Sequence, residues 1–251
     1  MKTRNIFAAL LLTLFSTAAF GQDITVDEII SNYLENIGGV DNWKKVKSIK
    51  MSAKLNQQGM EIPIEIVAMS DGRTYTKISF QGMNIMQGVF DGETLWATNF
   101  QSMQAEKSDA ETTGNFKLEM NDFPVAWIDY NAKVYTAELM GTETIDGSET
   151  YKVKLIKEPQ MIAGKEVESV SYYYFDTEAF VPLAEDQEVK SGPQAGIVAR
   201  TSYSDYDEVD GLYFAFSISE GVKDGPSQAI TFTAIELNPT VVESLFAYPG
   251  K

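Results

Sequence analysis

The chain has 251 residues, with 36 acidic and 20 basic side chains and a formal net charge of −16. It contains no histidine and no cysteine, which excludes Ser-His-Asp triads, thiol chemistry, disulfides and most zinc sites. The excess of acidic side chains argues against nucleic acid as a partner, because nucleic-acid affinity depends on basic contacts to phosphate.

The first 21 residues predict a signal peptide. Lys2 and Arg4 precede an apolar run over residues 6–15, and small residues follow that run. This order is typical of segments that direct export and are then removed, and the run is too short for a transmembrane anchor. No cysteine that could carry a lipid lies near the cleavage site. We therefore expect residues 1–21 to be cleaved and residues 22–251 to reach the periplasm.

A helix is predicted at the start of the mature chain. Thr25 and Glu28 fit a capping box, in which each side chain accepts a hydrogen bond from the backbone of the other residue. Apolar residues then recur at helical spacing: Val26, Ile29, Ile30, Tyr33, Leu34 and Ile37. Gly38 and Gly39 follow, and glycine readily adopts the left-handed conformation that ends helices.

From Ser48 the apolar period changes to two, which indicates strands with one buried face and one solvated face. Asp-Gly and Gln-Gly pairs separate the runs as turns. The runs lie at 48–56 and 60–68, around the turn at 91–92, and near 133–145, 149–157, 166–175, 181–190, 197–209, 212–222 and 228–237. No linker or repeat divides them, so we predict a mainly β (α+β) antiparallel meander in one domain over residues 22–251.

The alternation stops between residues 103 and 130. Ser108 to Glu111 could form a second capping box, and Phe116 and Met120 lie one helical turn apart. Pro124 interrupts the segment, so we expect one short helix on each side of it. A third cap is predicted at residues 240–243, near the end of the chain.

The stretch Phe90 to Trp96, FDGETLW, predicts a hairpin. A two-residue type I′ turn at Asp91-Gly92 would place Val89 opposite Thr94 and Gln87 opposite Trp96. Both faces of this hairpin would then be largely apolar. A thick sandwich or a closed barrel explains such a pattern, and so does a sheet that covers one face with its own helices and the other with a ligand. The chain's methionines suit a cavity for variable apolar guests, and they equally suit a loosely specified core.

Several short motifs resemble the LolA-like outer-membrane lipoprotein-sorting proteins. They are DGETLW at 91–96, SLFAYP at 244–249, the opening VDEIISNYLENIGG at 26–39 and YSDYDEVDGLYF at 203–214. The resemblance implies an incomplete antiparallel β-barrel with an N-terminal helix and short lid helices. It also implies a carrier or chaperone that holds lipoprotein acyl chains on a concave apolar surface. Such a carrier would move them through the periplasm toward the outer membrane, from an inner-membrane donor protein to an outer-membrane acceptor protein.

Alternation alone selects the candidate ligand-binding residues. They are Met51, Ile62, Ile64, Ile66, Met83, Ile85, Trp96, Phe100, Phe116, Met120 and Trp127. The resemblance makes Arg73 a candidate lid contact. Two positions depart from the family pattern, since no proline follows Arg73 and Ala215 stands where a sub-group more often has proline.

Three functions fit the sequence: a lipoprotein carrier, a binding protein for a free lipid or other hydrophobic ligand, and a non-catalytic β-rich interaction protein with a filled core. The densest acidic cluster, at 205–210, could bind calcium or support glycoside hydrolysis. Val209 stands where a calcium loop needs another oxygen ligand, so we interpret the cluster as solvated strand ends. We predict no catalytic residue, no metal ligand and no cofactor, and we expect a monomer that is not an enzyme.

Overall fold

The computed structural model of the protein describes residues 24–57 and 59–249, so the predicted signal peptide lies outside the described residues. The helices are α1 (Val26–Asn36), α2 (Val40–Trp43) and α3 (Ala110–Glu119), with 3-10 turns η1 (Met120–Asp122), η2 (Tyr130–Lys133) and η3 (Glu243–Leu245). The strands are β1 (Ser48–Gln57), β2 (Met60–Met69), β3 (Thr74–Phe80), β4 (Met83–Phe90), β5 (Leu95–Thr98), β6 (Ala105–Lys107), β7 (Thr136–Ile145), β8 (Ser148–Ile162), β9 (Lys165–Asp176), β10 (Pro182–Glu188), β11 (Val198–Val209), β12 (Leu212–Val222) and β13 (Ser227–Leu237). No helix in this part of the chain is both long and apolar enough to cross a bilayer.

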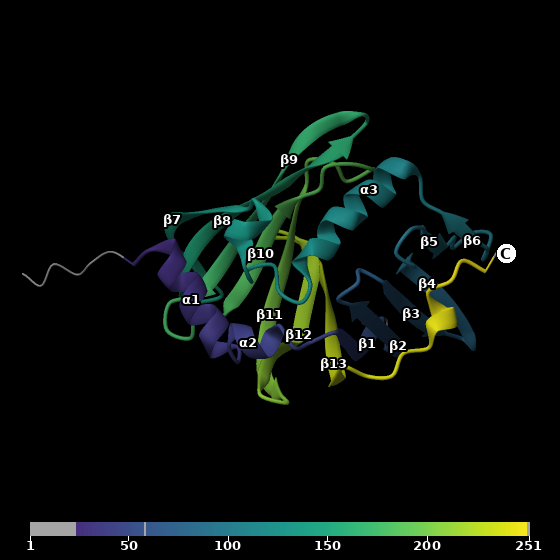
Figure 1. Ribbon diagram of the computed structural model, residues 1–251, viewed down its shortest axis with the longest axis horizontal. Helices are drawn as coiled ribbons and strands as arrows, with labels where there is room; N and C mark the ends of the chain where they lie inside the picture. The colour runs from purple at the N-terminus through teal and green to yellow at the C-terminus, as the bar shows by residue number, and fades with distance from the viewer. Residues whose placement is uncertain (1–23, 58, 250–251) are drawn as a thin grey trace, which may run out of the picture.

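All strands join one antiparallel sheet in the order β6-β5-β4-β3-β2-β1-β13-β12-β11-β10-β9-β8-β7. The central seam pairs β1 with β13, where Ile49 lies opposite Leu237. The sheet stays open, because β6 and β7 form its two edges and do not pair with each other. Figure 1 shows the sheet curving around the helices. The prediction of an incomplete antiparallel barrel is therefore confirmed.

The helix predicted at the mature N-terminus is confirmed, and it defines the inner face of the sheet. Thr25 and Glu28 form the capping box of α1. The apolar side of α1 is buried in the main core together with Ile49 and Ile64 from β1 and β2. Gly38 ends this region with φ of 111°, and a Cβ atom there would lie 2.3 Å from the carbonyl oxygen of Gly211. The close approach fixes α1 against the β11–β12 turn.

The helical predictions after the hairpin need correction. Asp109, not Ser108, caps α3, because its carboxylate accepts a hydrogen bond from the backbone N–H of Thr112 at 2.7 Å. Beyond Pro124 the chain forms turns and the 3-10 turn η2, not an α-helix. The third predicted cap precedes only a 3-10 turn, η3, whose N-cap Val242 provides no side-chain hydrogen bond.

The predicted hairpin register is wrong. Val89 pairs with Trp96 and Phe90 pairs with Leu95, so four residues connect β4 to β5. The reason lies in Asp91, whose Oδ1 accepts hydrogen bonds from the backbone N–H groups of Glu93 (2.9 Å) and Thr94 (2.7 Å). An aspartate that closes its own turn in this way stabilises a wider connection than a type I′ turn.

Packing on each side explains why both faces of the hairpin are apolar. Trp96 joins Val67, Tyr75 and Val89 on the outer face of the sheet, opposite to α1. Phe246 packs onto this cluster, with partly buried Val241, Leu245 and Tyr248 beside it. We call residues 241–248 the C-terminal brace. The brace covers the outer face of β2–β5, while the inner face of these strands remains available to helices or a ligand.

Candidate functional site

An aromatic cavity of about 310 Å³ lies on the inner face of the sheet. One wall comes from α1, α2 and β1, the second from residues 124–127, and the floor from β9–β12. The lining residues are mostly apolar or aromatic: Tyr33, Ile37, Trp43, Ile49, Met51, Pro124, Val125, Ala126, Trp127, Tyr173, Pro182, Glu185, Tyr203, Tyr206, Tyr213, Phe214, Ala215 and Ile218. Such a lining suits hydrocarbon, which gains free energy from burial without directional contacts.

Residues 124–130 are here called the cover segment, and the first four of them form the second wall of the aromatic cavity. Trp127 is buried and packs edge-on against Tyr173, with ring centroids 5.0 Å apart. Lys133 Nζ donates a hydrogen bond to the carbonyl oxygen of Ala126 at 3.2 Å. The hydroxyl of Tyr130 donates to the carboxylate of Asp27 in α1. The pKa of Tyr130 is raised to about 12, mainly by burial and to a smaller extent by this hydrogen bond. These contacts tie the cover segment to the helix beside it.

The tyrosines of the cavity present neutral hydroxyl groups. The pKa values of Tyr33, Tyr173 and Tyr203 are raised above the ordinary tyrosine value. Burial is the larger cause, and the negative charge of the nearby Glu185 carboxylate is the smaller one. Tyr203 donates a hydrogen bond to Glu185 at 3.0 Å. Neutral hydroxyl groups add polar points to the wall, and a hydroxyl that keeps its proton at neutral pH is a poor base or nucleophile.

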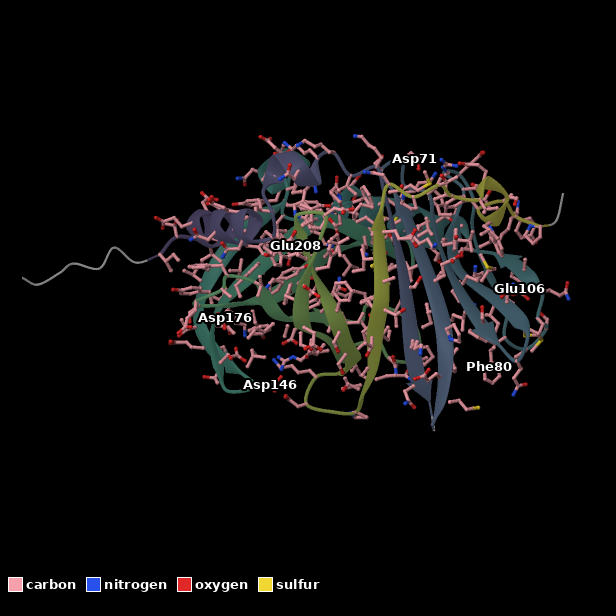
Figure 2. The ribbon with its side chains drawn as sticks, turned by 90° about the horizontal axis from the view of Figure 1, so that it is seen from below. Asp71, Phe80, Glu106, Asp146, Asp176 and Glu208 are labelled. Atoms are coloured by element: carbon pink, nitrogen blue, oxygen red, sulfur yellow. The ribbon has the colours of Figure 1, made fainter. Side chains whose placement is uncertain are left out.

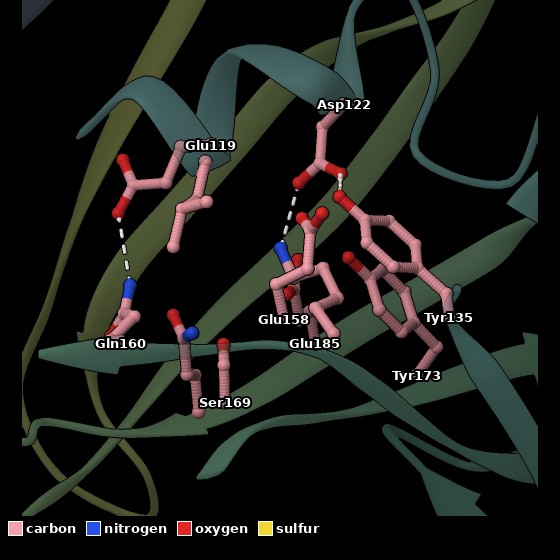
Figure 3. A pocket seen from close by; sticks show the side chains of 11 residues that line it. Glu119, Asp122, Tyr135, Glu158, Gln160, Ser169, Tyr173 and Glu185 are labelled. Carbon is pink, nitrogen blue, oxygen red and sulfur yellow. Dashed lines mark hydrogen bonds and ion pairs between the residues drawn. The ribbon is translucent and has the colours of Figure 1, made fainter. Parts of the chain in front are cut away.

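A second, polar cavity of about 280 Å³ adjoins the first and shares Tyr173 and Glu185 with it. Figure 3 shows its lining, in which Asp122 accepts hydrogen bonds from Lys157 Nζ at 2.7 Å and from the Tyr135 hydroxyl at 3.0 Å. The remaining lining residues are Leu118, Glu119, Glu158, Gln160, Ser169 and Gln187. The two cavities together form a trough on the inner face that is apolar at one end and charged at the other.

Within residues 24–57 and 59–249, no three Asp or Glu side chains converge as metal ligands. The acidic cluster at 205–210 is likewise exposed at each of its four acidic positions.

Only part of the predicted ligand-binding set meets in the aromatic cavity. Met51 and Trp127 line it. Ile62, Ile64, Ile66, Met83 and Ile85 share the inner face of β2–β4, as the pairing of Ile64 with Ile78 and of Ile78 with Ile85 requires. Phe116 of α3 contacts Phe90 of β4, with ring centroids 5.6 Å apart. Met120 lies beside Gly72.

Three predicted residues lie elsewhere. Trp96 is buried on the outer face, where its Nε1 donates to the carbonyl oxygen of Phe246 at 3.2 Å. Phe100 is exposed in the β5–β6 connection. The guanidinium of Arg73 pairs with Asp71 at 2.8 Å and with Glu243. Its observed ion pairs therefore lie in its own turn and at the C-terminal brace, not on α3.

Sequence reasoning missed the aromatic floor of the cavity. Tyr203 and Tyr206 both line it although they lie three residues apart on β11, and strict alternation would place them on opposite faces. Asp205 between them has φ of 54°, a left-handed conformation that aspartate adopts more readily than most residues. The Asp-rich stretch around the two tyrosines is a sequence signal for this break in alternation, but such a stretch is equally typical of an ordinary strand end.

Comparison with known proteins identifies the fold. No protein-family profile matches the sequence, and no curated protein matches it significantly. A solved DUF1329 family protein from Desulfovibrio piger aligns with a TM-score of 0.52 at 13% identity, over 89% of this chain and 97% of that one. A LolA superfamily protein from Nitrosomonas europaea aligns with a TM-score of 0.50 at 13% identity, over 89% and 98% of the two chains. Together with the open antiparallel sheet around its helices, these similarities show that the chain has a LolA-like fold.

Proposed function

We propose that the protein is a periplasmic carrier, exported through residues 1–21, whose single domain over 22–251 binds acyl chains of lipoproteins on its inner face. The aromatic cavity carries this proposal. It is the place where a hydrocarbon chain could replace solvent against an apolar wall. The protein would hold and release its cargo without chemistry, receiving it from an inner-membrane donor and passing it to an outer-membrane acceptor.

The size of the cavity supports partial enclosure of such a cargo. Its volume of about 310 Å³ is at the low end of the roughly 300–1,000 Å³ typical of ligand pockets. A long acyl chain gains roughly 0.8 kcal/mol for each buried methylene, or about 12 kcal/mol at most, and ordering and opening consume part of that gain. The rest of the chain would extend over the apolar inner face of β2–β4, where Ile62, Ile64 and Ile85 lie.

Helix α3 has the properties of a lid over that face. None of its side chains is buried. Asn115 joins it to the main chain of Met161 in β8 through two hydrogen bonds of 2.8 Å, and Phe116 contacts Phe90 of β4. The helix therefore bridges the two halves of the sheet, as Figure 1 also shows. Lifting it would uncover the inner face and expose the buried ring of Phe90, which Phe116 and Lys117 of α3 cover.

Ligand binding can be tested with one substitution made at two positions. Ala215→Phe places a phenyl ring in the aromatic cavity, whereas Ala234→Phe places the same ring at an exposed position on β13. We expect Ala215→Phe to weaken binding of a dansyl-labelled fatty acid by about tenfold or more, and Ala234→Phe to leave it unchanged. Circular dichroism verifies that both variants fold. Equal affinity of both variants for the probe would contradict the proposed site.

The class of cargo can be tested separately. Native mass spectrometry of the protein purified from an envelope fraction would reveal the mass of a bound adduct. A protein-sized adduct that carries acyl chains supports the lipoprotein carrier, and an adduct of lipid mass supports a binding protein for free lipid. Protein without any adduct, combined with no binding of the fatty-acid probe, would favour an interaction protein with a filled core.

A further inference from the structure

Three hairpin tips at one end of the sheet expose apolar side chains. They are the turns between β1 and β2, β3 and β4, and β5 and β6. The exposed fractions are 48% for Met60, 46% for Met83, 65% for Phe100 and 38% for Met103. These four are among the most exposed large apolar residues in the described chain, and each belongs to one of the three tips.

The strand order places these tips side by side. In an antiparallel meander, successive connections alternate between the two ends of the sheet, so the first, third and fifth connections share an end. Strands lie about 4.8 Å apart, which spaces neighbouring tips by about 10 Å. Figure 2 shows the arrangement, with Phe80 of the β3–β4 tip at one end of this half of the sheet and Asp71 at the other.

Charged groups stand behind the tips and not at their outermost residues. Glu61 follows Met60, and the Glu106 carboxylate accepts hydrogen bonds from Asn99 and Ser102 of the β5–β6 tip. Residues 80–83 and 99–104 contain no charged side chain, although the whole chain has a net charge of −16. The turns at the opposite end hold Asp71, Asp91 and Glu93. Acidic groups would resist approach to lipid, because they lose hydration there and are repelled by anionic headgroups. Uncharged Asn, Gln and Ser beside Met and Phe tolerate the membrane interface.

We propose that this surface, defined by Met60, Met83, Phe100 and Met103, docks on a lipid bilayer. The apolar side chains belong to three successive connections along one end of the sheet, and such a spread-out row fits a deformable surface better than a shaped protein partner. Flexible methionines and an aromatic ring can enter the interfacial layer to different depths. Met83 also continues the apolar inner face beyond Ile85, so the surface leads from the membrane toward the proposed ligand path.

The docking can be measured by flotation with phosphatidylcholine vesicles, using the chain from Gln22, because residues 1–21 are themselves apolar. The variant combines Met60→Gln, Met83→Gln, Phe100→Ser and Met103→Gln. We expect it to bind at least about tenfold more weakly than the unaltered chain. The matched control, Val134→Thr with Met140→Gln, removes other exposed apolar groups and should bind normally. Vesicles with added phosphatidylglycerol should bind less protein, and salt should restore binding by screening repulsion.

A reporter variant makes the test independent of the ligand. Phe100→Trp should show a blue shift and stronger emission on addition of vesicles, and a brominated lipid should quench it. The proposal is overturned if the unaltered chain does not float with either vesicle, or if the Val134/Met140 control loses as much binding as the tip variant. It is also overturned if the tip variant instead abolishes a dimer seen by sedimentation, which would make the surface a contact between two copies. Failure of fatty-acid binding alone would leave the docking result unaffected.

Discussion

Replacing Phe246 with alanine should weaken the fold while leaving the inner face intact. Phe246 is 2% exposed and lies on the outer cluster of β2–β5. Its ring meets Tyr75 edge-on at 5.2 Å, and the Arg73 guanidinium lies 5.1 Å from its centroid. Its carbonyl oxygen accepts the hydrogen bond from Trp96, which an alanine backbone can still accept. The substitution therefore removes apolar and aromatic contacts and no backbone hydrogen bond.

The magnitude follows from these contacts. Burial of a phenyl ring contributes roughly 1.5–3 kcal/mol, an edge-on aromatic pair about 0.5–1.5 kcal/mol, and a guanidinium over the ring about 0.5–1 kcal/mol. The sum, about 2.5–5.5 kcal/mol, brackets the range of about 3–5 kcal/mol typical of Phe→Ala in protein cores. The loss in the free energy of unfolding also has an upper limit. Once the C-terminal brace, residues 241–248, has detached from the sheet, Phe246 has no further contact to lose.

Urea unfolding followed by circular dichroism measures the loss in the free energy of unfolding. If the brace detaches first, Trp96 becomes hydrated and its emission shifts to the red before the sheet unfolds. Val242→Ala is the matched control, since Val242 belongs to the same segment but is 58% exposed, and it should cost less than about 0.5 kcal/mol. If the Phe246→Ala variant were as stable as Val242→Ala, the conclusion that the C-terminal brace stabilises the fold through Phe246 would be refuted. Fatty-acid binding by the folded variant should be unchanged.

Three further predictions concern other contacts. Asp186→Asn should cost about 3 kcal/mol at neutral pH, because the buried carboxylate accepts hydrogen bonds from Arg200 at 2.6 and 2.8 Å. Burial alone would raise the pKa of Asp186, but its donors hold it below the ordinary value, so thermal melts should show the difference shrinking as pH falls below about 4. Gly38→Ala should lower stability by about 2–4 kcal/mol, through its positive φ and its clash with Gly211, and thermal melts should detect it. Arg73→Ala should cost under about 1 kcal/mol by urea unfolding, less in high salt, and should leave fatty-acid binding unchanged.

The parts of the fold that depend on local signals could be predicted from the sequence. The capping box at Thr25 and Glu28 and the glycines after Ile37 determine α1 within a few residues of chain. Alternation located nearly all of the long strands. The pairing of β1 with β13 could not be predicted in the same way, because Ile49 and Leu237 carry no local mark of their contact. The hairpin register failed for a related reason, since the decisive hydrogen bonds come from one side chain, Asp91.

The site was harder to predict than the fold. Met51 and Trp127 line the aromatic cavity. Trp96 lies on the face opposite to Ile85 because β4 has a bulge between Gln87 and Phe90, where Gly88 has φ of 54°, and strict alternation does not anticipate a bulge. The tyrosines at 203 and 206 converge only because Asp205 changes the side-chain alternation. A period-two pattern assumes regular strands, so irregular positions that build a cavity wall are the ones it misses.

The two apolar faces of the sheet are covered by elements of different character, and this difference indicates which cover can move. The brace on the outer face inserts Phe246, a fully buried ring, among four strands. Trp127 of the cover segment is also buried, among three aromatic rings. None of the side chains of α3 is itself buried, and besides the ring contact of Phe116 with Phe90 the helix is held by hydrogen bonds at the β8–β9 tip. Since local opening costs least where little apolar surface is buried, α3 is the cover that can lift while the aromatic cavity and the outer face stay formed.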